Sequence, residues 1–172
     1  QNDLLARADE LRQLAKDGVP MLMICGMYQL FGRFFRTLKG EEIVGANILP
    51  IETIAGDERM IGNIVIRSQE FGDIVGYENH SGQTFLDKTV KPLGQVIKGA
   101  GNNMTDANEG VRYNNIIATY LHGPILPKNP QIADFLIGEA LERRGVSADS
   151  GLEKIDDILA DKAREMALKL SR

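Results

Sequence analysis

Two short apolar runs constrain the fold of this chain more than any other feature. Residues 19–25 and 115–121 are mostly aliphatic; Gly26 follows the first run, and a His-Gly-Pro sequence follows the second. Continuous apolar runs of this length are typical of strands buried on both faces, as in the parallel sheets of α/β proteins. We therefore expect an α/β fold built around these two strands.

The composition fits one globular domain over residues 1–172. Hydrophobic residues make up 43% and charged residues 26% of the chain, and the formal net charge is −4. The basic residues form no stripe, which argues against nucleic acid as a partner. No apolar stretch approaches the roughly 20 residues that span a bilayer, and no secretory signal is visible. A single cysteine excludes an internal disulfide, so we expect a cytoplasmic protein.

Periodicity predicts the remaining elements. Apolar residues recur at helical spacing over residues 3–17, 27–38 and 152–170. Asn129 as N-cap predicts a helix over residues 130–144, with proline at its first position. Short β-prone pieces separated by Gly and Asn turns predict an inserted region of hairpins, at residues 43–55, 60–67, 72–77 and 83–86. Because the chain opens with Gln1 already in helical pattern, we expect a fragment whose true N-terminus lies upstream.

Cys25 is the candidate nucleophile. It ends the first apolar run and is followed at once by a turn and a predicted helix. A nucleophile on such a strand-to-helix elbow is exposed at the carboxyl edge of the strand while its neighbours are packed. The amides at the start of the helix favour a thiolate and an adjacent oxyanion. The alternative is a structural cysteine, because free cysteine is among the most buried residue types.

His122 is the candidate base. It ends the second apolar run, and parallel strands deliver their last residues to the same edge of a sheet, where ligands bind in open α/β folds. An imidazole there accepts the proton of Cys25 and makes the thiol usable near neutral pH. The alternative is a structural histidine. One cysteine and two histidines without close ligand spacing fit no common zinc site, so we expect no metal.

Three motifs in order resemble those of a known family. Residues 23–32, Met-Ile-Cys-Gly-Met-Tyr-Gln-Leu-Phe-Gly, look like the nucleophile elbow of class I (triad-type) glutamine amidotransferases. Residues 77–80 (Tyr-Glu-Asn-His) and 120–124 (Tyr-Leu-His-Gly-Pro) are similar to motifs of the branch with cobyric acid synthase, and closest to the glutaminase subunit of lipid II isoglutaminyl synthase. The similarity covers most of residues 10–145. It implies a three-layer, flavodoxin-like α/β fold with a mostly parallel sheet and a β-rich hairpin insertion, the N-terminal strands missing from this chain.

The resemblance also implies roles for single residues. Cys25 is expected to attack glutamine, with His122 as base and the backbone N–H of Gly26 stabilising the oxyanion. Arg59 falls where the subfamily has an arginine that holds the substrate glutamine. Gln29 is expected either to contact the substrate or to hydrogen-bond within the elbow. No cofactor is expected in this chain.

The resemblance further implies a partner that uses the ammonia. In the favoured subfamily it is a Mur-ligase-like synthetase, carrying ATP and Mg, that amidates the D-glutamate of membrane-bound lipid II in peptidoglycan synthesis. The alternatives are a glutaminase domain for cobyrinic acid amidation, a non-catalytic amidotransferase-like binding module, and a cysteine hydrolase of other amides. Glutamine turnover would distinguish the two glutaminase functions from the binding module and from the hydrolase of other amides. The identity of the co-purifying chain would distinguish the lipid II glutaminase from the cobyrinic acid glutaminase.

Some positions depart from the family pattern or have plainer interpretations. Met27 replaces the second elbow glycine, and Pro124 stands where many class I enzymes have the glutamate that orients the histidine. We therefore expect an orienting carboxylate from Glu78 or, preferably, from the synthetase partner. His80 is expected to be a hydrogen-bonded loop histidine, and residues 99–101 (Gly-Ala-Gly) a surface turn rather than a phosphate loop.

Overall fold

Two β-sheets and the helices around them make up the part of the chain that the computed structural model describes, residues 1–147 and 155–169. The strands are β1 (Met21–Ile24), β2 (Phe34–Arg36), β3 (Glu42–Val44), β4 (Ile51–Ser68), β5 (Gly72–Leu86), β6 (Gly94–Lys98), β7 (Asn108–Glu109), β8 (Val111–Tyr113) and β9 (Ile116–Thr119). The helices are α1 (Asn2–Ala6), α2 (Ala8–Lys16), α3 (Gly26–Leu30), α4 (Ile125–Lys128), α5 (Pro130–Glu142) and α7 (Ile158–Lys169).

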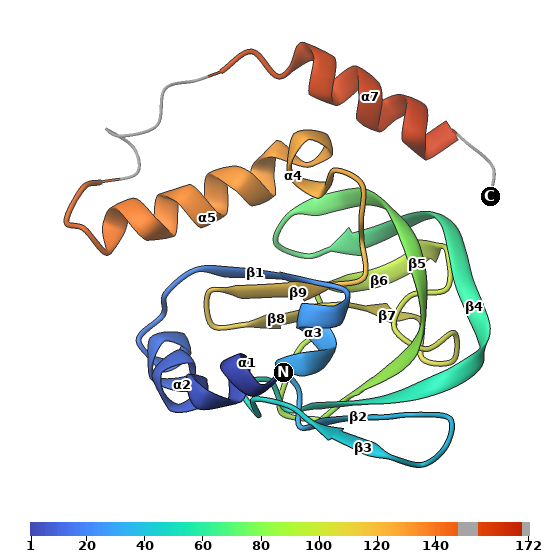
Figure 1. Cartoon of the computed structure of the whole chain (residues 1–172). Coiled ribbons are helices and arrows are strands. Elements are labelled where there is room, and N and C mark those ends of the chain that lie inside the picture. The colour runs from blue at the N-terminus through green and yellow to red at the C-terminus, as the bar shows by residue number, and fades with distance from the viewer. Residues whose placement is uncertain (148–154, 170–172) are drawn as a thin grey trace.

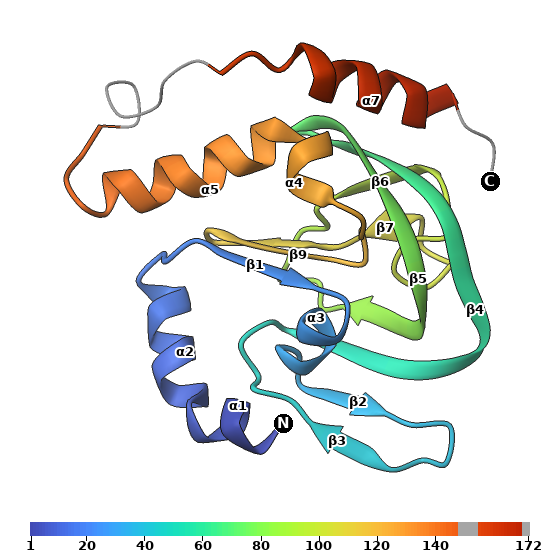
Figure 2. The same ribbon diagram turned by 45° about the horizontal axis from the view of Figure 1, so that its top comes forward.

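The smaller sheet has three strands in the order β1-β9-β8 and carries the two predicted buried strands. Helix α5 lies on one side of it, and α1, α2 and α3 lie on the other (Figures 1 and 2). The pairing of β1 with β9 is parallel and runs from Met21 opposite Ile116 to Ile24 opposite Thr119. Both strands therefore end at the same edge of the sheet, as the apolar runs predict.

The larger sheet is the predicted hairpin region. Its strand order is β3-β2-β4-β6-β7, and β5 pairs with β4. The predicted piece over residues 43–55 is divided between β3 and the start of β4, and the other three pieces fall within β4 and β5. These two long strands are antiparallel, and their register shifts between Ala55 and Met60. In the described part of the chain, β1 pairs with β9 and β2 with β4 in parallel, and the remaining strand pairs, including β4 with β5, are antiparallel.

One of the two clusters of buried apolar residues joins the two sheets and α5. Ile64 and Ile66 of β4 pack with Ile117 and Leu121 of the β9 segment and with Ile132 of α5, and all five are fully buried. Burial of large aliphatic side chains from both sheets stabilises their relative position. The end of β9 is thus in contact with β4 of the larger sheet as well as with β1.

The predicted helix over residues 27–38 is wrong in its second half. Helix α3 ends at Leu30, and the chain turns at Gly32 to enter β2. A side chain at Gly32 would place its Cβ 2.8 Å from the Ile51 side chain, so only glycine fits beside β4. The Arg33 N–H then donates to the Ile51 carbonyl at 2.9 Å. Pairing with β4 therefore overrides the helical spacing of the phenylalanines.

The other predicted helices have shifted bounds. The helix over residues 3–17 is divided at Arg7 into α1 and α2. Of the predicted helix over 152–170, residues 152–154 and 170 lie outside the described residues, 155–157 are not helical, and α7 buries none of its residues.

Asn129 is the N-cap residue of α5, as predicted, but its side chain makes no capping hydrogen bond to the helix. Its side chain is fully buried and reaches across to β5 instead. Oδ1 accepts the Val75 N–H at 2.9 Å, and Nδ2 donates to the carbonyls of Val75 at 2.9 Å and Ile125 at 2.7 Å. Asn129 therefore joins the start of α5 to the first part of β5.

Replacing Asn129 by Ala is expected to destabilise the protein by about 2–4 kcal/mol, because three buried backbone groups lose their partner. Urea unfolding measures this loss. Gln131→Ala is a matched control on the same helix, since it removes a single 3.3 Å bond to the Phe71 carbonyl. Equal losses for the two variants would contradict this role of Asn129.

Candidate active site

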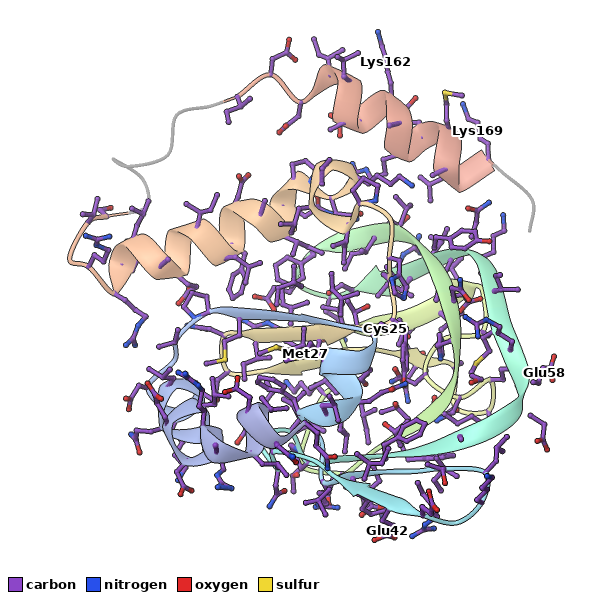
Figure 3. The ribbon with its side chains drawn as sticks, viewed as in Figure 1. Cys25, Met27, Glu42, Glu58, Lys162 and Lys169 are labelled. Atoms are coloured by element: carbon purple, nitrogen blue, oxygen red, sulfur yellow. The ribbon has the colours of Figure 1, made fainter. Side chains whose placement is uncertain are left out.

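Cys25 lies between β1 and α3, at the elbow that the sequence predicts (Figure 3). Its backbone has φ 54° and ψ −110°, a strained conformation for a residue with a side chain. The Cys25 N–H donates to the Thr119 carbonyl at 3.0 Å, and the Cys25 carbonyl accepts the Gln29 N–H at 3.1 Å. The elbow is thus held from both sides, and its thiol is only partly buried.

His122 follows β9 by three residues at the same edge of the sheet. A pair of backbone bonds fixes it to β5: Tyr77 N–H donates to the His122 carbonyl at 3.1 Å, and His122 N–H donates to the Tyr77 carbonyl at 2.8 Å. Its Nε2 atom is buried and has no hydrogen-bond partner among residues 1–147 and 155–169. Burial lowers the pKa of His122, so the neutral form, which accepts a proton, predominates at neutral pH.

The surroundings of Cys25 favour the thiol over the thiolate. Burial raises the pKa of Cys25, while the backbone N–H of Gly26 and the charge of Arg59 oppose that rise. The thiol therefore keeps its proton at neutral pH until a base removes it. These directions describe a neutral thiol at Cys25 and a neutral imidazole at His122.

Arg59 comes from the larger sheet, yet its charge acts on Cys25. It lies on an exposed, irregular part of β4, and its Nε donates to Asn79 Oδ1 at 2.7 Å. The charges of Arg59 and His122 also act on His80. The structure therefore groups the predicted nucleophile, base and substrate-binding arginine around one site.

Tyr120 contacts both the elbow and the larger sheet, a role that the sequence did not reveal. Its hydroxyl accepts a hydrogen bond from Gln29 Nε2 at 3.1 Å and shares one of 2.6 Å with Thr84 Oγ1. Its ring stacks on the His80 imidazole, with 3.5 Å between the ring centroids and 3° between the planes. The side chain of Gln29 thus hydrogen-bonds across to the residue that follows β9, and not to another residue of the elbow.

His80 is buried within β5 and is not the loop residue that we expected. Its Nδ1–H donates to the Gly82 carbonyl at 2.8 Å, which leaves Nε2 as an acceptor, buried and unpartnered in the described part of the chain. The pKa of His80 is lowered to about 4, mainly by burial; the hydrogen bond to the Gly82 carbonyl opposes this shift, and electrostatic interactions with His122 and Arg59 add to it. His80 is therefore neutral at pH 7.

Two buried glutamates, Glu78 and Glu109, accept hydrogen bonds from backbone N–H groups near this site. Glu78 accepts the N–H of Ala100 at 2.9 and 3.1 Å and that of Gly101 at 3.0 Å. The turn at residues 99–101 is therefore buried, not on the surface as expected, and its amides bind a carboxylate of the same chain. These bonds assign Glu78 to the turn. The second acid, Glu109, accepts bonds from the end of β9. No sequence pattern marks it, because its partners are ten and eleven residues away.

The family of the chain follows from comparison with known proteins. The model of the CobB/CobQ-like glutamine amidotransferase domain matches residues 2–130. The chain belongs to this family. It is 48% identical over 136 residues to the lipid II isoglutaminyl synthase (glutamine-hydrolyzing) subunit GatD of Staphylococcus aureus, which covers 79% of this chain and 55% of that protein.

Further relatives of this amidotransferase domain agree. GatD of Streptococcus pneumoniae is 38% identical over 167 residues, covering 95% of this chain and 64% of that protein. A probable cobyric acid synthase of Methanothermobacter thermautotrophicus is 30% identical over 164 residues, covering 87% of this chain and 31% of that protein. The chain thus spans between half and two thirds of the length of the GatD relatives.

A solved glutamine amidotransferase structure confirms the fold. It has a TM-score of 0.57 and 17% identity, and the match covers 81% of this chain and 68% of that chain. The prediction of an α/β glutamine amidotransferase fold is therefore confirmed. Within the described ranges, no group of three or more His, Cys, Asp or Glu is arranged to hold a metal ion, and no helix is long and apolar enough to cross a membrane.

The lowered pKa of His80 predicts a pH-dependent contribution to stability. Between pH 6.5 and about 4, the unfolded chain binds a proton at this histidine that the folded chain does not, so stability is lost as the pH falls. The stability advantage of the wild type over His80→Gln is expected to shrink by about 3 kcal/mol over this interval. Urea unfolding at several pH values measures it, and a pH-independent difference would contradict the burial of a neutral His80.

Proposed function

We propose that this protein hydrolyses glutamine through Cys25 and His122 and passes the ammonia to a synthetase. The observation that carries the proposal is the parallel pairing of β1 and β9, which brings the strained Cys25 elbow and the unpartnered His122 imidazole to one edge. Membership of the glutamine amidotransferase family supports glutamine as the substrate.

The reaction proceeds in two halves. The Cys25 thiol gives its proton to His122 as the sulfur attacks the side-chain amide carbon of glutamine, and the Gly26 N–H stabilises the oxyanion. His122 returns the proton to the leaving nitrogen, the C–N bond breaks, and ammonia and a thioester form. His122 then deprotonates a water, which attacks the thioester, and the proton passes to the departing sulfur. Glutamate leaves and Cys25 is again a thiol.

Arg59 is the proposed anchor of the substrate. Its guanidinium is exposed and near Cys25, and the bond to Asn79 uses only the Nε–H. The remaining donors suit the planar α-carboxylate of glutamine, which a guanidinium binds in bidentate fashion and an ammonium does not. In this arrangement Arg59 binds the α-carboxylate end of glutamine. The Cys25–His122 pair and the Gly26 N–H act at the side-chain amide end, and Gln29 supports the elbow through its bond to Tyr120.

The synthetase is proposed to be a Mur-ligase-like subunit that binds ATP and Mg and amidates the D-glutamate of lipid II at the cytoplasmic face of the membrane. The support is the higher identity to two GatD subunits, at 48% and 38%, than to the cobyric acid synthase of Methanothermobacter thermautotrophicus, at 30%. Amidation of cobyrinic acid is the second candidate, favoured only by that more distant similarity. Contact with the membrane is then indirect, through the partner.

The carboxylate that orients His122 is proposed to come from the partner. Pro124 stands where many class I enzymes have this acid, and Glu78 is engaged by the turn at residues 99–101. An acid supplied by the synthetase would restrict glutamine hydrolysis to the complex and so prevent loss of ammonia.

A glutamine-like electrophile, such as a diazo-ketone analogue, is expected to label Cys25, and Cys25→Ser is expected to abolish glutaminase activity. His122→Ala is expected to slow labelling, because the pKa of Cys25 is raised and the thiol then has no base. Peptide mass spectrometry measures the label, with excess glutamine as a protecting control. Labelling at the full rate in His122→Ala would exclude His122 as the base, and no turnover with the partner present would favour a non-catalytic binding module.

Arg59→Ala is expected to raise the Michaelis constant for glutamine by about 10- to 100-fold, since a charge-assisted contact is worth roughly 1.5–3 kcal/mol. The turnover number should change little if the contact is equally strong in ground and transition states. Arg36→Ala is the control, because Arg36 is an exposed arginine that pairs with Glu42. An unchanged Michaelis constant would remove Arg59 from the site.

A further inference from the structure

Glu109 joins the two sheets at the point where β9 ends. It belongs to β7 of the larger sheet, where it pairs with Gly94 of β6. Its carboxylate is fully buried, and its Oε1 atom accepts both the Thr119 Oγ1–H and the Tyr120 N–H at 2.7 Å. One oxygen of the larger sheet therefore holds two consecutive residues of the smaller one.

The residues that Glu109 holds are those on which the catalytic pair depends. The Thr119 carbonyl accepts the Cys25 N–H, and Thr119 Oγ1 accepts the Leu121 N–H at 3.0 Å. Tyr120 reaches the elbow through Gln29, and His122 follows two residues later. A shift of this segment would move the nucleophile and the base relative to each other.

We infer that Glu109 is a positioning residue of the glutaminase reaction, whose buried carboxylate fixes the segment 119–122 and with it the geometry of Cys25 and His122. This inference rests on the proposed function. Charge-assisted hydrogen bonds are stronger than neutral ones, so the deprotonated form of Glu109 holds the segment more tightly.

The surroundings of Glu109 make this hold sensitive to pH. Burial raises the pKa of Glu109 to about 7, opposed by bonds from Thr119, Tyr120 and the Gly110 N–H and reinforced by the charge of Glu78. Tyr28 and Tyr120 also face it and interact electrostatically with it. Its Oε2 atom is buried without a hydrogen-bond partner in the described ranges, so a proton there gains no acceptor. The hold therefore strengthens as the pH rises through about 7.

The first test compares the full chain with Glu109→Gln, which keeps an acceptor oxygen but cannot titrate. We expect the turnover number for glutamine to fall about tenfold, with a nearly unchanged Michaelis constant. The wild-type profile of turnover against pH should rise around pH 7, above the range where His122 loses its proton, and this rise should be absent in Glu109→Gln. Glu41→Gln, an exposed acid in the turn before β3, is the matched control and should behave as wild type.

Two further variants shift the titration in opposite directions. Glu78→Gln removes a neighbouring charge that raises the pKa of Glu109, so the rise in turnover should move to lower pH. Thr119→Val removes a bond that lowers this pKa, so the rise should move to higher pH. Carbon-13 NMR of the Glu109 carboxyl should show the same two shifts without any need for activity. These two variants decide the question if Glu109→Gln does not fold.

The alkylation rate of Cys25 by iodoacetamide separates this inference from the proposed function. If the chain does not hydrolyse glutamine, the proposed function fails, but slower alkylation above pH 8 in folded Glu109→Gln than in wild type still supports positioning by Glu109. A folded Glu109→Gln with wild-type turnover, pH profile and alkylation would overturn the inference. So would a pH profile that neither Glu78→Gln nor Thr119→Val moves.

Discussion

The hydrogen bond from the Cys25 N–H to the Thr119 carbonyl is the contact on which the rest of the site depends. It is the last hydrogen bond between the parallel strands β1 and β9, and beyond it both strands end. A shift of one residue in this register would turn every side chain of a strand to the other face. The positions of Cys25 and His122 are therefore set by the backbone of two buried strands.

The larger sheet stabilises the positions of Tyr120 and His122, which follow strand β9 of the smaller sheet. Its hairpin supplies the backbone pair of Tyr77 with His122, the stacking of His80 on Tyr120, and the bond from Thr84 to the Tyr120 hydroxyl. Asn129 ties α5 to the same hairpin. The β-rich insertion thus helps to hold the segment that contains Tyr120 and His122. Buried polar groups that are paired in this way favour one arrangement, because each displaced partner leaves an unsatisfied group.

The sequence was informative where the physical signal is local. The two apolar runs and the residues that end them were sufficient to predict Cys25 and His122 at one edge, because strand burial and direction determine where a strand ends. The helix over residues 27–38 failed because the fit of Gly32 against Ile51 depends on a strand nearly twenty residues away. Glu109 and the side-chain partners of Asn129 were not predicted for the same reason: these partners come from other elements, and no spacing in the sequence marks them.

The most direct test of this account is whether a covalent intermediate forms on Cys25. Acid quenching during turnover of isotopically labelled glutamine, followed by peptide mass spectrometry, would detect the glutamyl thioester. The account predicts a labelled adduct on the peptide that contains Cys25 in the wild type and none in Cys25→Ser. Hydrolysis of glutamine by the Cys25→Ser variant at the wild-type rate, or an adduct on another residue, would contradict it.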